Sequence, residues 1–402
     1  MIEQFLALDQ FLLQHQALWR PRPFAERFLP WEQTYPQLAA WLRNRSLAEA
    51  EAAHNDPGGL AAPAPFADLA AQAAALTLVP ALPAVQQIST DARQSTDVPG
   101  RKWQQIQAFC STLEFSAQPQ HWLDWCAGKG HLGRLLANNG GALTCVERDP
   151  ALVEEGRRLS QRRGINAAHE QQDVMAADVA RFLNPTATPV ALHACGDLHV
   201  RLLQLSIDRG CRQLAVAPCC YNRIERDAYQ PLSSAARQSE LRLSKDDLGL
   251  PLSQTVTAGA RERRQRDQSM AWRLGFDALQ RELREDDTYL PAPSLPIAWL
   301  KKNFANYCRD LAALKGLPEP GEQPWEKLER HGWQRLAEVR NLELLRALFR
   351  RPLELWLLLD RALLLGENGY SVRLGTFCAT ELTPRNLLLL AELPTSTENS
   401  CK

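Results

Sequence analysis

The sequence predicts an α/β fold of the Rossmann-like type, built around a seven-stranded sheet. Residues 121–126 are short, aromatic and apolar, as expected of a buried strand, and a glycine-rich turn and the start of a helix follow them. Residues 366–395 contain two apolar segments around a Thr-Pro-Arg-Asn turn, which predicts a closing antiparallel hairpin. Further strand-like segments indicate that the rest of the sheet is parallel; they lie at 143–146, 167–169, 190–195 and 214–217.

The turn after the first predicted strand indicates a ligand site. Gly128, Gly130 and Gly133 have the G-x-G-x-x-G spacing, which lets the backbone approach a ligand closely and opens a helix N-terminus towards it. A phosphate-binding P-loop is excluded, because Leu123 stands where that motif needs its first glycine and no Ser or Thr follows Lys129. The turn therefore predicts a nucleotide-like cofactor.

Acidic residues at the first three predicted strands narrow the choice of cofactor. Glu147 lies about 20 residues beyond the turn, where an acid accepts hydrogen bonds from ribose hydroxyls. Asp173 follows the third strand, where a carboxylate suits the amino group of an adenine. Asp124 stands just before the turn, where it attracts the ammonium of a methionine moiety and repels a pyrophosphate. These acids favour S-adenosylmethionine over a dinucleotide, with an NAD-linked oxidoreductase as the competing interpretation.

Polar side chains at the ends of the fourth and fifth predicted strands are the candidates for the acceptor side. His193 and Asp197 flank the point where the fourth strand breaks, and each is a candidate base for the acceptor proton. Tyr221 follows the fifth strand and is a candidate for stacking on a planar acceptor. The alternative for these residues is a structural role, such as a histidine satisfied by the backbone within the core.

Three cysteines at the same strand ends permit several interpretations. Pyrimidine C5 methylation uses cysteine thiolates at these positions, so Cys195 with Cys219 or Cys220 would act as nucleophile and partner. A zinc site that includes His193 is disfavoured, because the sequence has no Cys-x-x-Cys pair and adjacent residues of an extended strand point to opposite faces. Small, inert, buried thiols are the default, and we expect no metal.

Several motifs together resemble a known family. They are D-x-C-A-G-K-G-H-L at 124–132, L-H-A-C-G-D-L at 192–198, P-C-C-Y at 218–221 and T-P-R-N at 383–386. They are similar to the methyltransferase domain of the eukaryotic methyltransferase-like proteins once described as ribosomal RNA adenine dimethylase domain-containing. The same domain resembles that of a glutathione S-transferase C-terminal domain-containing protein and, more distantly, the tRNA 2′-O-methyltransferases of the acceptor stem.

The resemblance implies a class I methyltransferase sheet with S-adenosylmethionine as the cofactor. It implies methyl transfer to ribosomal or transfer RNA. The alternatives are a protein or small-molecule acceptor, or a protein that binds the cofactor without turnover. The expected catalytic residues are His193, Asp197 and Tyr221, and the residues expected at the cofactor are Asp124, Ala127, Gly128, Gly130, Glu147, Asp173 and His193.

The rest of the chain predicts helical additions to this core. Apolar residues recur at helical spacing over 2–18 and 32–53, and a Pro/Gly/Ala-rich linker follows. The predicted division has four parts. They are a helical N-terminal module at 1–90, a cofactor-binding core at 100–222, a mainly helical insert at 223–365 and a hairpin at 366–395 that completes the sheet.

Composition limits the partners and the compartment. The formal net charge of the 402 residues is zero, which excludes a uniformly basic surface but permits local basic patches. Ten cysteines without a signal peptide indicate a reducing compartment, so we expect a cytoplasmic protein, and no apolar segment is long enough for a membrane span. The insert combines basic with aromatic residues, which predicts RNA contacts unless these residues are only a solvated surface; the basic ones are Arg261, Arg263, Arg264, Arg266, Lys301 and Lys302.

Overall fold

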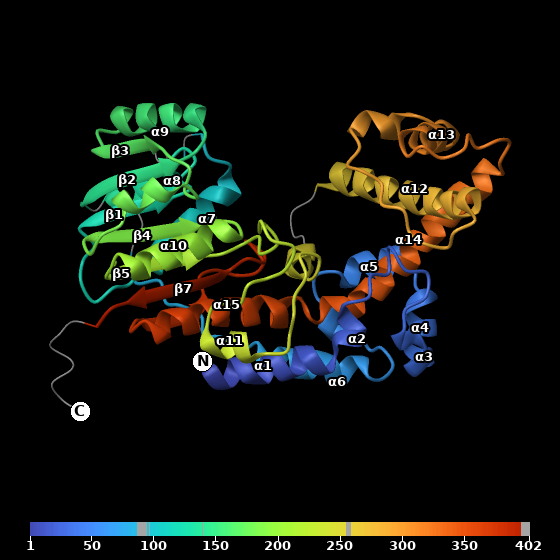
Figure 1. Cartoon of the computed structure of the whole chain (residues 1–402), viewed down its shortest axis with the longest axis horizontal. Coiled ribbons are helices and arrows are strands. Elements are labelled where there is room, and N and C mark those ends of the chain that lie inside the picture. Colours follow the sequence, from blue (N-terminus) through green and yellow to red (C-terminus); the bar gives the residue numbers. More distant parts are fainter. Residues whose placement is uncertain (87–94, 96, 139, 255–258, 395–402) are drawn as a thin grey trace. The chain divides into compact units, whose positions relative to one another are not determined.

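The computed structural model describes residues 1–86, 95, 97–138, 140–254 and 259–394. The chain forms two compact units, and each is built from segments that are distant in sequence (Figure 1). Unit 1 comprises Met1–Leu13, Leu76–Ser253 and Arg351–Lys402, and unit 2 comprises Gln14–Ala75 and Gln254–Arg350. The sheet lies in unit 1, and the regular elements described in unit 2 are helical.

The sheet of unit 1 confirms the predicted fold class. Its seven strands have the order β3-β2-β1-β4-β5-β7-β6. Strands β1 to β5 pair in parallel, whereas β7 pairs antiparallel with both β5 and β6, as predicted for the closing hairpin. The strands are β1 (His121–Trp125), β2 (Ala142–Glu147), β3 (Ala167–Gln171), β4 (Ala187–Leu192), β5 (Gln213–Ala217), β6 (Ser371–Thr376) and β7 (Leu387–Glu392).

Helices cover the sheet through apolar packing. On one face, Trp103 and Phe109 from one helix and Leu135 from another share a buried core with Val190 and Leu388 of the strands. Such burial supplies most of the free energy that holds helix and sheet together. The helices of unit 1 are α1 (Ile2–Gln14), α7 (Gly100–Ser111), α8 (His131–Ala137), α9 (Pro150–Arg162), α10 (Asp197–Asp208), α11 (Ser234–Gln238) and α15 (Arg350–Glu367).

Helix α1 belongs to unit 1, which differs from the predicted N-terminal module at 1–90. Its Asp9 carboxylate accepts hydrogen bonds from the Trp356 indole of α15 at 2.8 Å and from the Ser239 hydroxyl at 2.6 Å. Phe5 packs on the same indole, with ring centroids 5.2 Å apart. A contact between the two ends of the chain leaves no trace in local sequence patterns, so the sequence did not predict it.

Unit 2 combines parts of two predicted modules. Gln14–Ala75 and Gln254–Arg350 share one core, in which Leu47 packs against Leu336 and Val339. Its helices are α2 (Gln16–Trp19), α3 (Trp31–Thr34), α4 (Pro36–Arg43), α5 (Leu47–Ala53), α6 (Phe66–Leu76), α12 (Ala260–Arg284), α13 (Phe304–Leu314) and α14 (Trp325–Ala347). Short 3-10 helices in the two units lie at Pro57–Gly59, Ala177–Phe182, Asp247–Ser253 and Ile297–Lys301.

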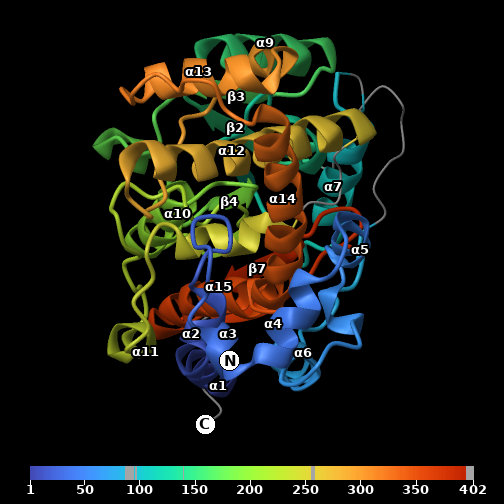
Figure 2. The same cartoon turned by 90° about the vertical axis from the view of Figure 1, so that its right-hand side faces the viewer.

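The single helix predicted over 32–53 is three helices in the structure. Proline favours the first turn of a helix and lacks the amide that a helix interior needs, so Pro36 begins α4. Ser46 then caps α5: its hydroxyl accepts from the Glu49 amide, and the Glu49 carboxylate accepts from the Ser46 amide. Helix α14 crosses α12 closely (Figure 2), since a β-carbon on Gly332 would lie 2.2 Å from the carbonyl oxygen of Ala271.

Candidate cofactor and acceptor site

The glycine turn after β1 has the backbone geometry of a ligand-binding loop. Cys126, Gly128 and Gly130 have φ angles of 58°, 56° and 71°, in the left-handed region. A β-carbon on Gly130 would lie 2.8 Å from the His169 ring, so close packing requires glycine there. A β-carbon on Gly128 would have nothing within 4 Å, so that position faces open space. The turn is therefore packed on one side and open on the other.

The Glu147 carboxylate is held against this turn by backbone amides. Its Oε2 accepts from the Gly128 amide at 3.0 Å. Its Oε1 accepts from the amides of Arg148 at 2.9 Å and Asp149 at 3.0 Å. Three donors orient the half-buried carboxylate at the end of β2, where the sequence analysis expected an acceptor for ribose hydroxyls.

The Asp124 carboxylate lies inside unit 1, only 2 % exposed. Its Oδ2 accepts a hydrogen bond from the Gly133 amide at 2.8 Å, which joins β1 to the first turn of α8. Burial raises the pKa of this carboxyl to about 7, although the Gly133 amide and the positive charges of Arg134 and Lys102 oppose the rise. Asp124 therefore stabilises the segment that follows the glycine turn by accepting from the Gly133 amide.

Asp173 and Ala127 lie beside the same turn. Asp173 is exposed after β3, and its Oδ1 accepts from the Met175 amide at 2.9 Å, which forms a tight turn. The Gln172 amide donates to the Glu147 carbonyl at 2.8 Å, so this loop is tied to the end of β2. Ala127 donates its amide to the Val146 carbonyl at 3.0 Å. The structure thus brings the predicted cofactor residues to the carboxyl ends of β1, β2 and β3.

His193 follows β4 in a left-handed conformation, with a φ of 66°. Its Nε2 lies 2.9 Å from Oε1 of Gln105 on α7, and because that carbonyl oxygen only accepts, Nε2 carries the ring hydrogen. Burial, reinforced by the charges of Lys102 and Arg385, lowers the pKa of His193 to about 4. The ring is neutral near pH 7 and is a weak base there, which favours a positioning role.

Asp197 and Tyr221 differ in burial, and therefore in whether their side chains can contact an acceptor. Asp197 is half-buried, and its Oδ2 accepts from the Glu225 amide at 2.8 Å, which holds the loop after β5. Tyr221 is 1 % exposed and packs with its edge on His199, under the Arg361 guanidinium. A side chain buried this completely does not stack on an acceptor, so the prediction of Tyr221 as an acceptor contact is wrong.

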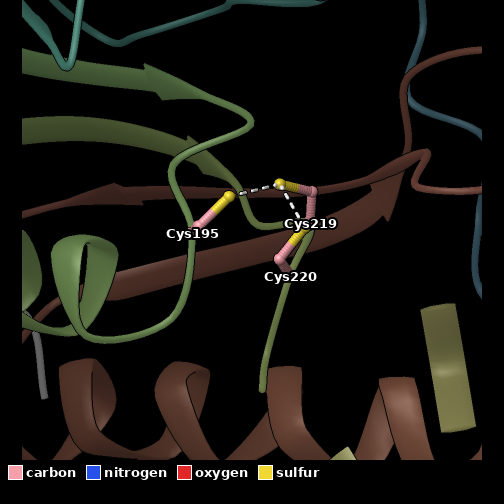
Figure 3. Close-up of side chains that lie close together, drawn as sticks. All are labelled: Cys195, Cys219 and Cys220. Atoms are coloured by element: carbon pink, nitrogen blue, oxygen red, sulfur yellow. Dashed lines mark hydrogen bonds between the residues drawn. The ribbon is translucent and has the colours of Figure 1, made fainter. Parts of the chain in front are cut away.

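The sulfurs of Cys195, Cys219 and Cys220 converge at the ends of β4 and β5 (Figure 3). The Sγ atoms of Cys195 and Cys219 are 3.3 Å apart, and those of Cys219 and Cys220 are 3.7 Å apart. Adjacent cysteines were predicted to point to opposite faces if this segment were extended, and that condition is not met. Strand β5 ends at Ala217, so the alternation of an extended strand no longer applies at Cys219 and Cys220.

Some residues of this edge were missed in the sequence. Gln105 lies on α7, outside every motif, and only the tertiary fold brings its side chain to His193. Arg385 belongs to the predicted Thr-Pro-Arg-Asn turn, and the hairpin returns it close enough to act electrostatically on His193 and Cys220. The polar Thr-Pro-Arg-Asn turn could have indicated Arg385 in the sequence. Because β7 is antiparallel to both β5 and β6, the turn between β6 and β7 lies at the edge of the sheet where β5 ends.

The predicted basic patch lies in unit 2. Arg261, Arg263 and Arg264 are exposed in the first turns of α12, and Lys301 is exposed before α13. Two further members of the patch have acidic partners: Arg266 lies 3.1 Å from Glu51, and Lys302 pairs with Asp310. The patch is therefore less positively charged than the sequence suggested.

Unit 2 also contains a cavity of about 580 Å³. Its charged lining is largely compensated, because Glu338 lies 2.7 Å from Arg43 and 2.9 Å from Arg335. The cavity is not part of the edge described above, which lies in unit 1. Among the described residues, no helix has both the length and the apolar composition that a membrane span requires.

One family model matches part of unit 1. Residues 101–227 match the family model of a methyltransferase domain. The matched segment contains β1 to β5, the glycine turn and the three cysteines. Unit 1 therefore contains a segment that is similar to a methyltransferase domain and that forms the parallel part of a Rossmann-like α/β sheet.

Similar solved structures are related only distantly. A methyltransferase from Clostridium acetobutylicum ATCC 824, described as S-adenosylmethionine-dependent, is 17% identical over 30% of this chain and 50% of its own, with a TM-score of 0.22. A coclaurine N-methyltransferase bound to N-methylheliamine and SAH is 13% identical over 85% of this chain and 93% of its own, with a TM-score of 0.28. A structure described by conversion of a disulfide bond into a thioacetal group during echinomycin biosynthesis is 21% identical over 24% of this chain, with a TM-score of 0.21.

Similarity this low carries no argument about the chemistry of this chain. The chain spans 43% and 50% of the first two structures that it matches. No curated protein matches it in sequence.

Proposed function

We propose that the whole chain is an S-adenosylmethionine-dependent methyltransferase whose acceptor binds beside the ends of β4 and β5. The observation that carries this proposal is the Glu147 carboxylate, held by the Gly128, Arg148 and Asp149 amides beside the open face of the glycine turn. An oriented carboxylate next to an exposed backbone fits the ribose of an adenosyl group.

The predicted cofactor residues have complementary roles in this proposal. Glu147 accepts from the ribose hydroxyls, and Asp173 accepts from the adenine amino group. Asp124 is buried and acts indirectly, because its Oδ2 accepts from the Gly133 amide and keeps the turn in place. The open space at Gly128 is where the cofactor approaches the backbone.

The acceptor side orients its substrate more than it activates it. When bound, the cofactor supplies a methyl group on a positively charged sulfur, which is already a strong electrophile. His193 is a weak base and donates to Gln105, and one Asp197 oxygen accepts from the Glu225 amide. These residues fix the acceptor loops, and alignment of the acceptor accounts for most of the rate enhancement.

Calorimetric titration with S-adenosylmethionine and S-adenosylhomocysteine tests the cofactor site. We expect micromolar binding by the wild-type chain and a loss of at least tenfold in affinity for Glu147→Ala. The exposed Glu154 on α9 provides the matched control, so Glu154→Ala keeps the wild-type affinity. Absence of binding by the folded wild-type chain, or unchanged binding by Glu147→Ala, would overturn the proposed site; NAD serves as the competing ligand.

We also propose RNA as the acceptor, which is a finer statement than the methyltransferase domain itself. It is supported by the resemblance to RNA-related methyltransferases and by the exposed arginines at the start of α12. Phosphate contacts by such side chains weaken steeply as salt increases. Transfer of a labelled methyl group into RNA and protein fractions tests the acceptor class.

The controls for this experiment separate RNA binding from chemistry. Arg261→Glu together with Arg264→Glu is expected to reduce RNA methylation and to leave S-adenosylmethionine affinity unchanged. Label that enters only protein or small molecules would exclude RNA as the acceptor. Charge reversal on α14 at the exposed Arg330 is the control for a general effect of charge.

A further inference from the structure

Three thiols from two separate loops meet at one point of unit 1. Cys195 follows β4, and Cys219 and Cys220 follow β5. Their sulfurs all lie within 4.8 Å of one another, and the side chains point towards a common centre (Figure 3). Inert structural thiols are usually scattered through a core, so the convergence of three requires an explanation.

The spacing of the sulfurs matches a metal centre. Zinc binds thiolates at about 2.3 Å in a tetrahedron, which places neighbouring sulfurs about 3.8 Å apart. The observed separations of 3.3 Å and 3.7 Å are close to that value. We propose that Cys195, Cys219 and Cys220 bind a zinc ion as three thiolate ligands.

The loops that carry the cysteines are held together before any metal binds. The Asp197 amide donates to the Arg223 carbonyl at 3.1 Å, and the Asp197 carboxylate accepts from the Glu225 amide. A β-carbon on Gly196 would lie 1.9 Å from that same carbonyl oxygen, so the two loops are in direct backbone contact. This arrangement reduces the conformational entropy lost when the ligands are ordered around an ion.

The charge around the cluster suits the complex. Three thiolates and one divalent zinc ion have a net charge of −1. Arg385 and Arg223 both lie close enough to Cys220 to act on it electrostatically, and their positive charges offset this excess. Thiolate ligands also select zinc over harder cations such as magnesium or calcium.

The fourth coordination position is open. Among the residues that the structure describes, no other His, Asp, Glu or Cys joins the three sulfurs, and Nε2 of His193 is engaged by Gln105. Cys195 and Cys220 are half-buried, so a water molecule completes the tetrahedron. Three protein ligands with an open position are typical of zinc sites that meet a substrate. The site depends on the cysteine geometry and not on the proposed methyl transfer.

Metal analysis of the full chain, purified under reducing conditions after growth with added zinc, tests the site. We expect one equivalent of zinc per chain in the wild type. Each of Cys195→Ser, Cys219→Ser and Cys220→Ser is expected to bind zinc at least tenfold more weakly in competition with a chromogenic chelator. Cys378→Ser is the matched control, because Cys378 is a half-buried cysteine of the same unit outside the cluster, and it keeps one equivalent.

A measurement on the wild-type chain tests the site even if the cysteine variants fail to fold. Alkylation of the native, zinc-loaded chain is compared with alkylation after chelator treatment, because Cys110, Cys145, Cys211 and Cys308 are buried with or without zinc. Zinc is expected to add protection of three thiols, which peptide mapping is expected to identify as Cys195, Cys219 and Cys220. Substoichiometric metal in reduced, folded wild type, or zinc-dependent protection only of other cysteines, would overturn the proposal. S-adenosylmethionine binding by the same preparations separates this result from the cofactor site, since loss of either one leaves the other measurable.

Discussion

At the scale of single residues, burial decides what a carboxylate does. Asp124 precedes the glycine turn in the sequence and Glu147 follows it. Glu147 is half-buried and its carboxylate accepts from three amides, whereas Asp124 is 2 % exposed and its Oδ2 accepts from the Gly133 amide. The carboxylate of Glu147 remains accessible to a ligand. The carboxylate of Asp124 is costly to ionise, because burial removes its hydration.

The raised pKa of Asp124 predicts a pH-dependent stability. Its ordinary value is 3.8 and its value in the folded chain is about 7, so the folded state holds a proton that the unfolded state has lost between these two values. The contribution of Asp124 to the free energy of unfolding therefore falls as the pH rises from about 4 to about 7, whereas the lowered pKa of His193 acts in the opposite direction. A shift of this size corresponds to roughly 4 kcal/mol.

Asp124→Asn removes this contribution and retains an oxygen acceptor for Gly133. Urea unfolding at several pH values is expected to show that the free energy of unfolding of the variant increases, relative to that of the wild type, as the pH rises across this range. Glu154→Gln, on the exposed surface of α9, serves as the control and leaves the profile unchanged. Identical profiles for Asp124→Asn and the wild type would show that the buried carboxyl is not the titrating group.

At the scale of elements, a buried polar network joins α15 to the segments that follow β4 and β5 in unit 1. Asp360 accepts from the Tyr229 hydroxyl at 2.5 Å and from the Ser233 amide at 2.7 Å. Arg361 donates to His199 at 2.7 Å, and Nδ1 of His199 lies 3.2 Å from the Ala194 carbonyl. The pKa of His199 is lowered far below its ordinary value by burial, so the neutral ring accepts from Arg361.

Removal of Asp360 from this network leaves buried donors without their acceptor. Asp360→Ala is expected to lower the free energy of unfolding by about 1–3 kcal/mol or more, because the Tyr229 hydroxyl and the amides of Leu232 and Ser233 lose the carboxylate that accepts from them. Chemical denaturation measures the loss. Glu381→Ala, at an exposed position of the same unit, is the control and is expected to change stability little; equal effects of the two substitutions would contradict a stabilising network.

The close packing of α12 and α14 in unit 2 predicts that a larger side chain at their crossing lowers stability. A β-carbon on Gly332 of α14 would lie 2.2 Å from the Ala271 carbonyl oxygen and 2.9 Å from the Gly275 amide nitrogen. Gly332→Ala therefore overpacks the crossing with α12, and we expect a loss of about 1–3 kcal/mol or more.

The control for Gly332→Ala is a substitution that is expected to increase stability. Gly366 lies in α15, where a β-carbon would have nothing within 4 Å. Gly366→Ala is expected to stabilise the chain by up to about 1 kcal/mol, since alanine has the higher helix propensity. Thermal unfolding compares the two variants, and stabilisation by Gly332→Ala would mean that the helices separate easily.

At the scale of the whole molecule, the two units predict a localised response to ligand. The cofactor residues all lie in unit 1. At a ligand concentration near 100 times Kd, binding stabilises the folded state by about 2.7 kcal/mol. S-adenosylhomocysteine is expected to slow amide hydrogen exchange around Gly128, Glu147 and Asp173, and to leave α12 and α14 of unit 2 unchanged. Equal protection of α12 and α14 would show that the ligand acts on both units.

The order of the units along the chain explains why their boundaries were difficult to predict. Local patterns identified helical segments at both 1–90 and 223–365, but unit 2 takes Gln14–Ala75 from one and Gln254–Arg350 from the other. Asn341 illustrates the reason: its amide donates to the carbonyls of Arg45 and Ser46, almost three hundred residues earlier in the chain. No local periodicity encodes such a pairing.

The sequence by itself determined the strand, glycine turn and helix around Gly128, the acid at Glu147 and the closing hairpin. These depend on short-range properties, namely apolar periodicity, backbone freedom at glycine and spacing along one segment. The tertiary structure alone decided that Tyr221 is buried, that Gln105 meets His193, that α1 packs on α15 and that three cysteines converge. Each of these depends on how distant segments pack, because burial and side-chain direction beyond a strand end are properties of the assembled core.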